Sequence, residues 1–397
     1  MKTNRVFLDY ASTTPVDNKV VKIMQLYLNK FFHNASALYS EGVANRQTID
    51  DCRKKISRIV QSRQNEVIFT GSGTESINLA IIGTVREIAE KIKKEKKDFV
   101  PHVITTNIEH VAVLESVKRI EKEGASVTYL PVAENGQISE NDIINALRPE
   151  TVLISVMLAN NEIGTILPIR KIGIAISKYK KENNRSRNSF PYFHTDASQG
   201  PNYLEINIDQ LSVDMMTLDG SKIYGPKGVG CLIKKSFVPL QAVLYGGSHE
   251  FGFRPSTENL PQIVGFTKAL EIADENREKE FVRLSKLQNY FFEKIVSQIP
   301  NTKINGDTKN RLPNNISICI DGLNSEFAVI QMDDQGVCCA AMSACKNLSG
   351  EANSYVVEAI STNCGRSSLR FSMGRFTKKS DIDFAIKALK KITKINI

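Results

Sequence analysis

Short apolar runs rich in β-branched residues alternate with helical stretches through the first half of the chain. The runs cover residues 67–69, 103–105, 127–130, 152–156, 192–195 and 215–218. Such alternation is typical of buried strands joined by helices, and it predicts an α/β fold with a doubly wound, mostly parallel sheet. In that architecture ligands bind beyond the carboxyl ends of the strands. We therefore expect the functional residues to follow the strands directly.

A long amphipathic stretch, residues 262–298, breaks this alternation and ends before Pro300. It predicts one long helix that leads into a second, α+β unit. In that unit we expect strands at 315–320 and 368–373 and helices at 325–332 and 380–392. A chain of 397 residues agrees with one large and one smaller domain. We expect a large domain of residues 15–260 and a small domain of residues 1–14 and 261–397, sharing one cleft.

The composition is that of a globular protein, with 41% apolar and 24% charged residues. No apolar run is long enough to cross a bilayer, and the first five residues do not lead into a signal-peptide core, so we expect a cytoplasmic protein without a membrane partner.

The net charge of +9 arises from local runs, chiefly residues 91–97, residues 178–181 with Arg185 and Arg187, and the C-terminus. We interpret these runs as solvated helix faces. The alternative is a docking surface for an acidic protein or RNA, but no aromatic residues interleave with the runs, so direct nucleic-acid binding is not expected.

The seven cysteines are an odd number without framework spacing, which argues against a disulfide scaffold: Cys52, Cys231, Cys319, Cys338, Cys339, Cys345 and Cys364. No CxxC pair or zinc-finger spacing exists and only five histidines are present, so no metal is expected. Cys345 lies in a small, polar stretch beside Lys346, where exposure and the neighbouring charge favour the thiolate. Cys345 is therefore the candidate nucleophile, and we interpret the other six as small buried core residues.

Three further stretches have residue types that carry chemistry. Residues 70–76, Thr-Gly-Ser-Gly-Thr-Glu-Ser, follow a predicted strand and open a helix, an arrangement that binds phosphate through backbone N–H groups. Asp196 ends another strand and either pairs with a protonated pyridine nitrogen or caps the next helix. Lys222 follows a third strand, where an amine held out of bulk water can attack an aldehyde. The competing Lys227 lies inside the Gly/Pro turn and is expected to face solvent or an anion.

These four stretches, in this order, resemble the cysteine desulfurase family within the class V aminotransferases of pyridoxal phosphate (PLP) fold type I. The resemblance runs nearly end to end and includes residues 8–15, Glu109-His110, residues 160–164, residues 246–259 and residues 369–377. The Ser-Ala-Cys sequence at 343–345 is similar to the subgroup with a long, flexible cysteine loop that delivers sulfur to acceptor proteins.

The resemblance implies roles for individual residues around PLP and L-cysteine. Lys222 would hold PLP as a Schiff base and move the α-proton of the substrate, and Cys345 would take its sulfur as a persulfide and leave L-alanine. Arg370 would clamp the substrate carboxylate. The remaining assignments are His110 stacked on the ring, Asp196 at the ring nitrogen, Asn161 and Gln199 near the ring hydroxyl, and Gly73 and Thr74 at the phosphate. Thr257 would complete the phosphate site of a neighbouring subunit, which implies a homodimer.

Two residues depart from the family where it binds the phosphate. The family has Ser-x-His-Lys, whereas this chain has Asp219-Gly220-Ser221-Lys222. A carboxylate repels a phosphate dianion, so Asp219 points away, pairs with a base, or weakens cofactor binding. Ser221 can still donate one hydrogen bond. A lesser departure is Phe251 with Pro255-Ser256, where the family has Arg and Ser-Gly.

The sequence leaves two alternatives to a cysteine desulfurase. One is a selenocysteine lyase or another class V PLP enzyme. The other is a degenerate paralogue that binds PLP weakly and acts as a sulfur relay or binding partner. The sulfur acceptor, for iron–sulfur cluster assembly or tRNA thiolation, is not specified by the sequence.

Overall fold

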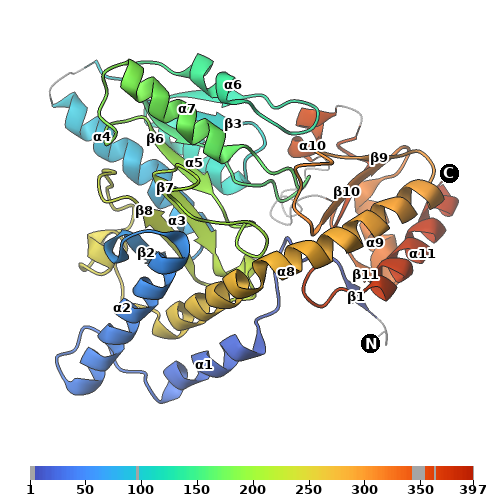
Figure 1. The fold of residues 1–397 in the computed structure, drawn as a ribbon, viewed down its shortest axis with the longest axis horizontal. Helices are drawn as coiled ribbons and strands as arrows, with labels where there is room; N and C mark the ends of the chain where they lie inside the picture. The colour runs from blue at the N-terminus through green and yellow to red at the C-terminus, as the bar shows by residue number, and fades with distance from the viewer. Residues whose placement is uncertain (1–4, 95–97, 342–353, 362–363, 397) are drawn as a thin grey trace.

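The computed structural model describes residues 5–94, 98–341, 354–361 and 364–396 (Figure 1). Its largest sheet has seven strands in the order β2-β8-β7-β6-β5-β3-β4. The strands are β2 (Val67–Thr70), β3 (His102–Thr106), β4 (Ser126–Leu130), β5 (Thr151–Ser155), β6 (Tyr192–Asp196), β7 (Met215–Asp219) and β8 (Gly230–Lys234). Only β8 runs antiparallel to its neighbours. The predicted α/β fold with a mostly parallel sheet is confirmed, and β8 is the strand that the sequence did not indicate.

Helices cover both faces of this sheet, as doubly wound topology requires. Neighbouring residues of a strand point to opposite faces, so Val103 packs in one apolar cluster and Ile104 in another. The cluster around Val103 includes α3 (Gly73–Asn78), α4 (Thr84–Lys93) and α5 (Val111–Lys122), and the cluster around Ile104 includes α2 (Ser40–Val60), α6 (Glu140–Ala146) and α7 (Ile169–Glu182). These helices fix the sheet edge where β6 and β7 end, at Asp196 and Asp219.

The long predicted helix is α8 (Leu260–Gln298), and it spans two apolar cores. Its first half, with Phe266 and Leu270, packs in the core of the large sheet, next to α1 (Asn18–Asn29) and α2. Its second half, with Leu284 and Phe291, packs in a separate core. That core holds the sheet β12-β10-β9, of β9 (Thr302–Ile304), β10 (Asn315–Ile320) and β12 (Ser368–Ser372), and the helices α9 (Ser325–Asp334) and α11 (Lys379–Asn396).

The N-terminal segment joins this second core rather than the first. β1 (Val6–Phe7) pairs in parallel with β11 (Val337–Cys338), and Leu8 is buried among the residues of the second core. The chain then passes from the small sheet to α1, so residues 8–15 run between the two cores (Figure 1). Within the described residues, no helix combines the length and the apolar character needed to cross a membrane.

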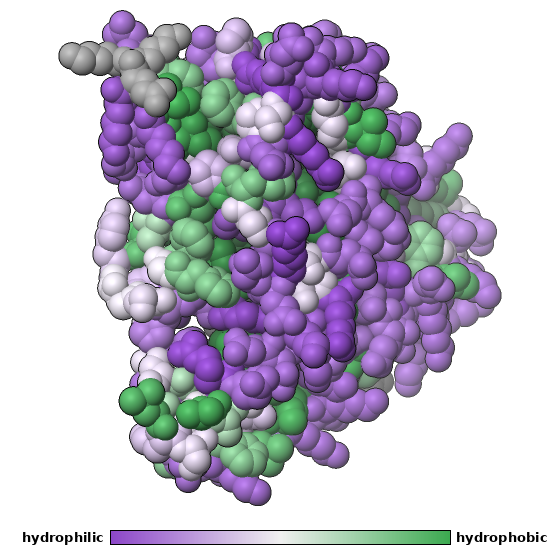
Figure 2. All heavy atoms as spheres, turned by 60° about the vertical axis from the view of Figure 1, so that its left-hand side comes forward, coloured by the Kyte–Doolittle hydropathy of each residue, from purple (hydrophilic) through white to green (hydrophobic). Residues whose placement is uncertain are grey.

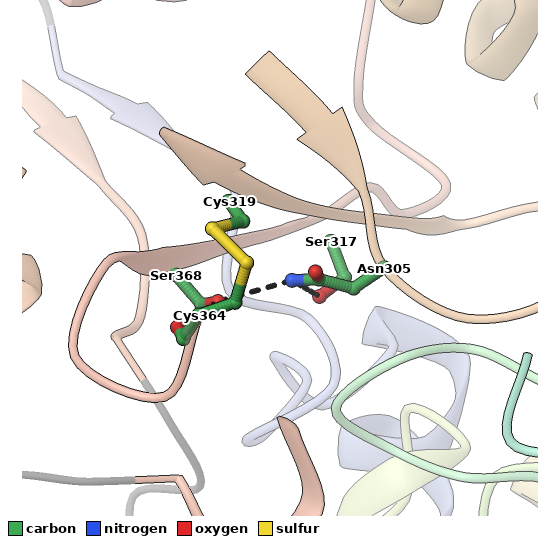
Figure 3. The surroundings of a disulfide bond; sticks show 5 residues. All are labelled: Asn305, Ser317, Cys319, Cys364 and Ser368. Atoms are coloured by element: carbon green, nitrogen blue, oxygen red, sulfur yellow. Dashed lines mark hydrogen bonds between the residues drawn. A yellow bond between two sulfur atoms is a disulfide. The ribbon is translucent and has the colours of Figure 1, made fainter. Parts of the chain in front are cut away.

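Cys319 and Cys364 form a disulfide bond, which corrects the interpretation of all cysteines other than Cys345 as unlinked core residues (Figure 3). Cys319 lies on β10 opposite Ser368 of β12, and Cys364 lies in the turn that leads into β12. The chain reversal therefore brings their Cα atoms to 5.6 Å. The Ser368 hydroxyl donates to the Cys364 carbonyl at 2.7 Å and fixes this turn. Both cysteines are buried, so the expectation of burial holds for them.

Candidate active site

A cavity of about 160 Å³ opens at the sheet edge where β6 and β7 end. Nine of the twelve candidate residues line it: Gly73, Thr74, His110, Asn161, Asp196, Gln199, Asp219, Lys222 and Arg370. These residues come from β6, β7, β12, the starts of α3 and α5, and the loops between them. Of the remaining three, Ser221 and Thr257 do not line the cavity, and Cys345 lies outside the described residues.

Lys222 reaches the cavity because β7 turns sharply into a short 3₁₀ turn, Gly220–Lys222. Its Nζ donates to the backbone carbonyl of Ser12, and its own carbonyl accepts a hydrogen bond of 2.7 Å from Asn202. The side chain is half-buried, whereas Lys227 is exposed on the turn that follows. Of the two candidate lysines, Lys222 alone lies at the cavity.

The carboxylate of Asp196 is held in place by Ser198, two residues further along the chain. Its Oδ1 accepts from the backbone N–H of Ser198 at 3.0 Å and from the Ser198 hydroxyl at 2.6 Å. No helix begins at this position, so the alternative role of Asp196 as a helix cap is wrong. Gln199, three residues on, donates to the carbonyl of Ala11 at 3.1 Å and ties this turn to residues 8–15.

His110 begins α5, and its Nδ1 accepts from the backbone N–H of Ala112 at 3.2 Å. The preceding residue, Glu109, is completely buried. Its Oε1 accepts from the Thr106 hydroxyl and the Met157 N–H, both at 2.9 Å, while Oε2 has no hydrogen-bond partner within the described residues. Burial raises the pKa of Glu109 to about 8, with a further contribution from the charge of Asp196. Glu109 is therefore a neutral acid behind His110 at pH 7.

We expect Glu109→Gln to remove most of the pH dependence that this residue gives to folding. The pKa of Glu109 is higher in the folded state, so its stabilising contribution is complete below about pH 4.5 and is lost as the pH rises through about 8. A pKa difference of one is worth about 1.4 kcal/mol, so the wild type should lose on the order of 3 kcal/mol more than the variant between pH 5 and pH 9. Urea unfolding at several pH values measures this, and parallel profiles for the two proteins would contradict it.

Arg370 is buried on β12 with most of its donors engaged. One terminal nitrogen donates to Asp9 at 2.7 Å and to the Ser12 hydroxyl at 2.8 Å, and the other donates to the Asn161 carbonyl at 3.0 Å. Its Nε is buried and finds no hydrogen-bond partner among the described residues. The guanidinium group is thus held in place by three acceptors at the wall of the cavity.

The expected phosphate end of the cavity holds a carboxylate of the protein itself. Asp219 Oδ2 accepts from the Gly73 N–H at 2.9 Å. Asp219 Oδ1 accepts from the Ser221 N–H at 2.7 Å and from the Ser221 hydroxyl at 2.6 Å. Asp219 thus neither points away nor pairs with a base. The expectation that Ser221 has a hydrogen bond to offer a phosphate is wrong for this state, because its hydroxyl donates to Asp219.

Thr257 lies on the exposed surface of the loop 246–259, away from Lys222. It lines a separate hollow of about 190 Å³ together with Gly71 and Arg254. The loop is fixed by Glu250, which is buried and receives two hydrogen bonds from Arg53, at 2.6 and 2.9 Å. The role of Thr257 in a neighbouring subunit stays a prediction.

The cavity residues Ser12, Met157 and Ser198, and Asp9 next to the cavity, were not assigned by the sequence reasoning. Ser12 binds both Lys222 and Arg370, and Asp9 is the ion-pair partner of Arg370. Residues 8–15 carried a signal, since they were part of the family resemblance, but no residue type in them indicated which cavity they would line. Ser198 follows Asp196 by two residues, the spacing at which a hydroxyl and an N–H reach the same carboxylate oxygen.

The described chain on either side of residues 342–353 is attached to residues at or next to the cavity. On one side, Ala340 exchanges backbone hydrogen bonds of 3.0 and 2.7 Å with Arg370. On the other side, the Ser354 hydroxyl donates to Glu162 at 2.6 Å, next to Asn161, and the Tyr355 hydroxyl donates to the Glu109 carbonyl, next to His110. The segment that contains Cys345 therefore starts and ends beside candidate site residues.

The cavity has residues that suit the ring of PLP and a lysine that suits its aldehyde. One residue, a carboxylate, would repel its phosphate. Lys222, Asp196 and His110 converge from three elements on one small space, and Arg370 lines the same space with a cationic side chain. The carboxylate of Asp219 uses the Gly73 N–H that a phosphate would need. No group of three or more His, Cys, Asp or Glu side chains within the described residues is arranged to hold a metal ion.

Proteins of known family share both the sequence and the architecture of this chain. The family described as aminotransferase class-V matches residues 6–384. The cysteine desulfurase IscS of Dictyoglomus turgidum is 38% identical over 389 residues, covering 98% of this chain and 94% of that protein. A probable mitochondrial cysteine desulfurase of Dictyostelium discoideum is 36% identical, covering 97% of this chain and 82% of that protein. Among solved structures, a NifS-like protein superposes with a TM-score of 0.87 at 26% identity, over 99% of this chain and 100% of that one.

Proposed function

The chain belongs to the class V aminotransferases and is a PLP-dependent cysteine desulfurase, and on this premise we propose that Lys222 and Cys345 carry its two chemical steps. L-cysteine is the substrate, and the sulfur passes to acceptors. The observation that carries the assignment is the convergence of Lys222, Asp196 and Arg370 on one cavity, with Ala340 and Ser354 attached to its wall.

PLP, when bound, withdraws electrons from the amino acid and so weakens the bonds at its Cα. The chain's own residues supply binding, orientation and proton transfer. Arg370, which lines the cavity, would bind the substrate carboxylate. Asp196, fixed by Ser198, keeps a proton on the ring nitrogen. The Lys222 amine would hold PLP and, when free, would take the α-proton of the substrate.

Cys345 completes the reaction by taking the sulfur of the substrate. Its thiolate forms a bond to the substrate sulfur while the bond between that sulfur and Cβ breaks, and the electron pair of the broken bond stays with carbon. A proton then adds to the carbon, which leaves L-alanine and a persulfide on Cys345. Cys345 can lie up to about 18 Å from Ala340, because five residues separate the two and five residues span at most about 18 Å.

The homodimer and the domain boundaries are further parts of the proposal. Exposed apolar side chains gather on α1, α2 and their connection, at the lower end of Figure 2: Leu28, Phe32, Leu38, Tyr39 and Val43. Such a patch suits burial against a second copy of the chain, which would bring Thr257 to its neighbour's phosphate site.

The domains of 15–260 and of 1–14 with 261–397 are supported by the two cores, although α8 contributes to both. A cytoplasmic location and an acceptor in iron–sulfur cluster assembly or tRNA thiolation stay predictions.

Absorbance spectroscopy followed by an alanine assay tests the assignment. The purified protein supplied with PLP should absorb in the visible range, respond to L-cysteine and release L-alanine. Cys345→Ser should keep the absorbance and its response to L-cysteine but lose turnover, because only the sulfur step needs the thiol. A selenocysteine lyase or an aminotransferase would differ, since transamination should be unaffected by Cys345→Ser. No visible absorbance even at high PLP would favour the degenerate paralogue.

A further inference from the structure

A second hollow, of about 1250 Å³, lies at the opposite edge of the seven-stranded sheet. Its wall includes Phe193 and Asp214, where β6 and β7 begin, and Lys235, just after the end of β8. β6 and β7 run from this edge to the edge with Asp196 and Asp219. Strands of five residues at about 3.3 Å per residue separate the two edges by roughly 16 Å. The hollow is therefore distinct from the active site.

Cationic side chains outnumber carboxylates around this hollow. Seven cations line it, against the three carboxylates of Glu66, Asp209 and Asp214: Arg58, Arg63, Lys180, Lys181, Arg185, Arg187 and Lys235. Each carboxylate already has partners in the protein. Glu66 accepts from the backbone and hydroxyl of Ser236, Asp209 pairs with Lys235 at 2.7 Å, and Asp214 accepts from the Phe193 N–H at 2.9 Å.

Four of the cations are left to act on a ligand. Within the described part of the chain, no ion pair is made by the side chains of Arg58, Arg63, Lys181 and Arg187. They come from the end of α2, the segment before β2, α7 and the loop 183–191, and they meet only because the fold brings these segments together. Convergence of cations from four segments on one concave surface raises the local positive potential.

Lys180 adds a buried charge to the same wall. Its side chain is 6% exposed, and its Nζ donates to the Arg187 carbonyl at 3.2 Å and lies 3.9 Å from Asp214. Burial lowers the pKa of Lys180, Arg185 and Arg187 lower it further, and Asp214 opposes them. An anion in the hollow would stabilise this ammonium and offset the repulsion among the cations.

Polar side chains such as Ser177 and Ser212 line the hollow between the cations, and its apolar residues are buried in the wall. A concave surface with an excess of cations suits a small ligand with several negative charges, and the volume is ample for such a molecule. One guanidinium group can donate two parallel hydrogen bonds to two oxygens of a phosphate group. We propose that this hollow binds a phosphorylated small molecule of the nucleoside polyphosphate class. Its concave shape favours such a ligand over an RNA backbone or an acidic protein, which the sequence left as alternatives for these charges.

Isothermal titration calorimetry of the PLP-loaded enzyme tests this proposal, since the loaded cofactor keeps the probe out of the active site. ATP should bind with one site per chain, AMP should bind at least about tenfold more weakly, and adenosine should give no signal, because each phosphate adds contacts to the cations. Added salt should weaken ATP binding. The double variant Arg63→Ala/Arg187→Ala should lower the affinity for ATP at least about tenfold.

The matched control removes the same charge from the exposed surface of α8, as Lys279→Ala/Lys286→Ala, and should bind ATP like the wild type. If the first variant does not fold, Arg58→Ala/Lys181→Ala serves in its place, because both side chains are exposed. The proposal is overturned if ATP gives no binding at millimolar concentration, or if the rim variant and the control lose affinity equally. Binding of a single-stranded RNA or an acidic peptide without binding of ATP would also overturn it.

Discussion

Asp219→Ser should lower the dissociation constant of PLP by about a hundredfold. In the wild type the cofactor phosphate must approach a carboxylate that already accepts from Gly73 and Ser221. Two unit charges 4 Å apart repel by about 4 kcal/mol at the effective dielectric constant of a protein surface, and a hundredfold change in affinity is about 2.8 kcal/mol. Serine removes the charge and leaves the Gly73 N–H for the phosphate. Titration of the apo protein with PLP, followed by absorbance, measures the change.

A second variant at position 219 and a control variant show whether the charge of Asp219 itself weakens PLP binding. Asp219→Asn keeps the shape and one acceptor oxygen but removes the charge, so it should recover part of the gain. Asp321→Ser removes an exposed carboxylate that does not line the cavity, and it should leave PLP affinity unchanged. Equal affinity for the wild type and Asp219→Ser would mean that the Asp219 side chain swings away from the phosphate at no cost. Ser221→His, which restores the family residue, should add to the gain.

Glu250→Gln should destabilise the folded protein by about 3–5 kcal/mol, because it leaves the buried guanidinium of Arg53 without its counter-charge. The two side chains are 2% and 7% exposed and share two hydrogen bonds. Glu250 also accepts from the Phe69 N–H at 2.8 Å, and the rings of Phe69 and Phe251 lie about 5 Å from the guanidinium. Urea unfolding at pH 7 measures the loss of stability.

An exposed ion pair provides the comparison. Lys118 and Glu115 on α5 are 2.7 Å apart, but their side chains are 53% and 61% exposed. Glu115→Gln should therefore cost less than about 1 kcal/mol. A loss for Glu250→Gln no larger than that for Glu115→Gln would show that Arg53 finds another partner. Because Glu250 fixes the loop 246–259, its loss should also impair dimer formation if Thr257 serves a neighbouring subunit.

The strands and the long helix could be predicted because their signals are local. Runs such as Met215–Leu218 are apolar and β-branched or bulky on both faces, as strands buried on two sides must be, and Lys222 and Asp196 follow directly from where those strands end. β8 was missed because it directly follows the glycine-rich turn 225–229 and begins with a glycine. α2 carries few apolar residues on a polar background, and the packing of α1 and α2 against α8 is tertiary information.

Side-chain partners at the site could not be predicted in the same way. The residue type of Asp219 showed a conflict with phosphate, but the choice among three outcomes depended on Gly73, 146 residues earlier in the chain. The pairing of Cys319 with Cys364 depended on the register of β10 with β12. Asp9 gained its role only when β1 joined β11, which places the N-terminal segment next to Arg370. In each case the partner was set by which distant segments the fold places side by side, and the composition of the chain does not show this.

The attachment of Ala340 to Arg370 also affects how well the Cys345 thiol competes with free thiols for the substrate sulfur. Whatever path residues 341–344 take, a thiol tethered five residues from a fixed point is confined to a small volume. A sphere of radius about 18 Å that contains one group corresponds to an effective concentration on the order of 0.1 M. A free thiol at millimolar concentration would meet the substrate sulfur far less often. With Cys345 as the sulfur carrier that we propose, this tether gives it a kinetic advantage over diffusing thiols.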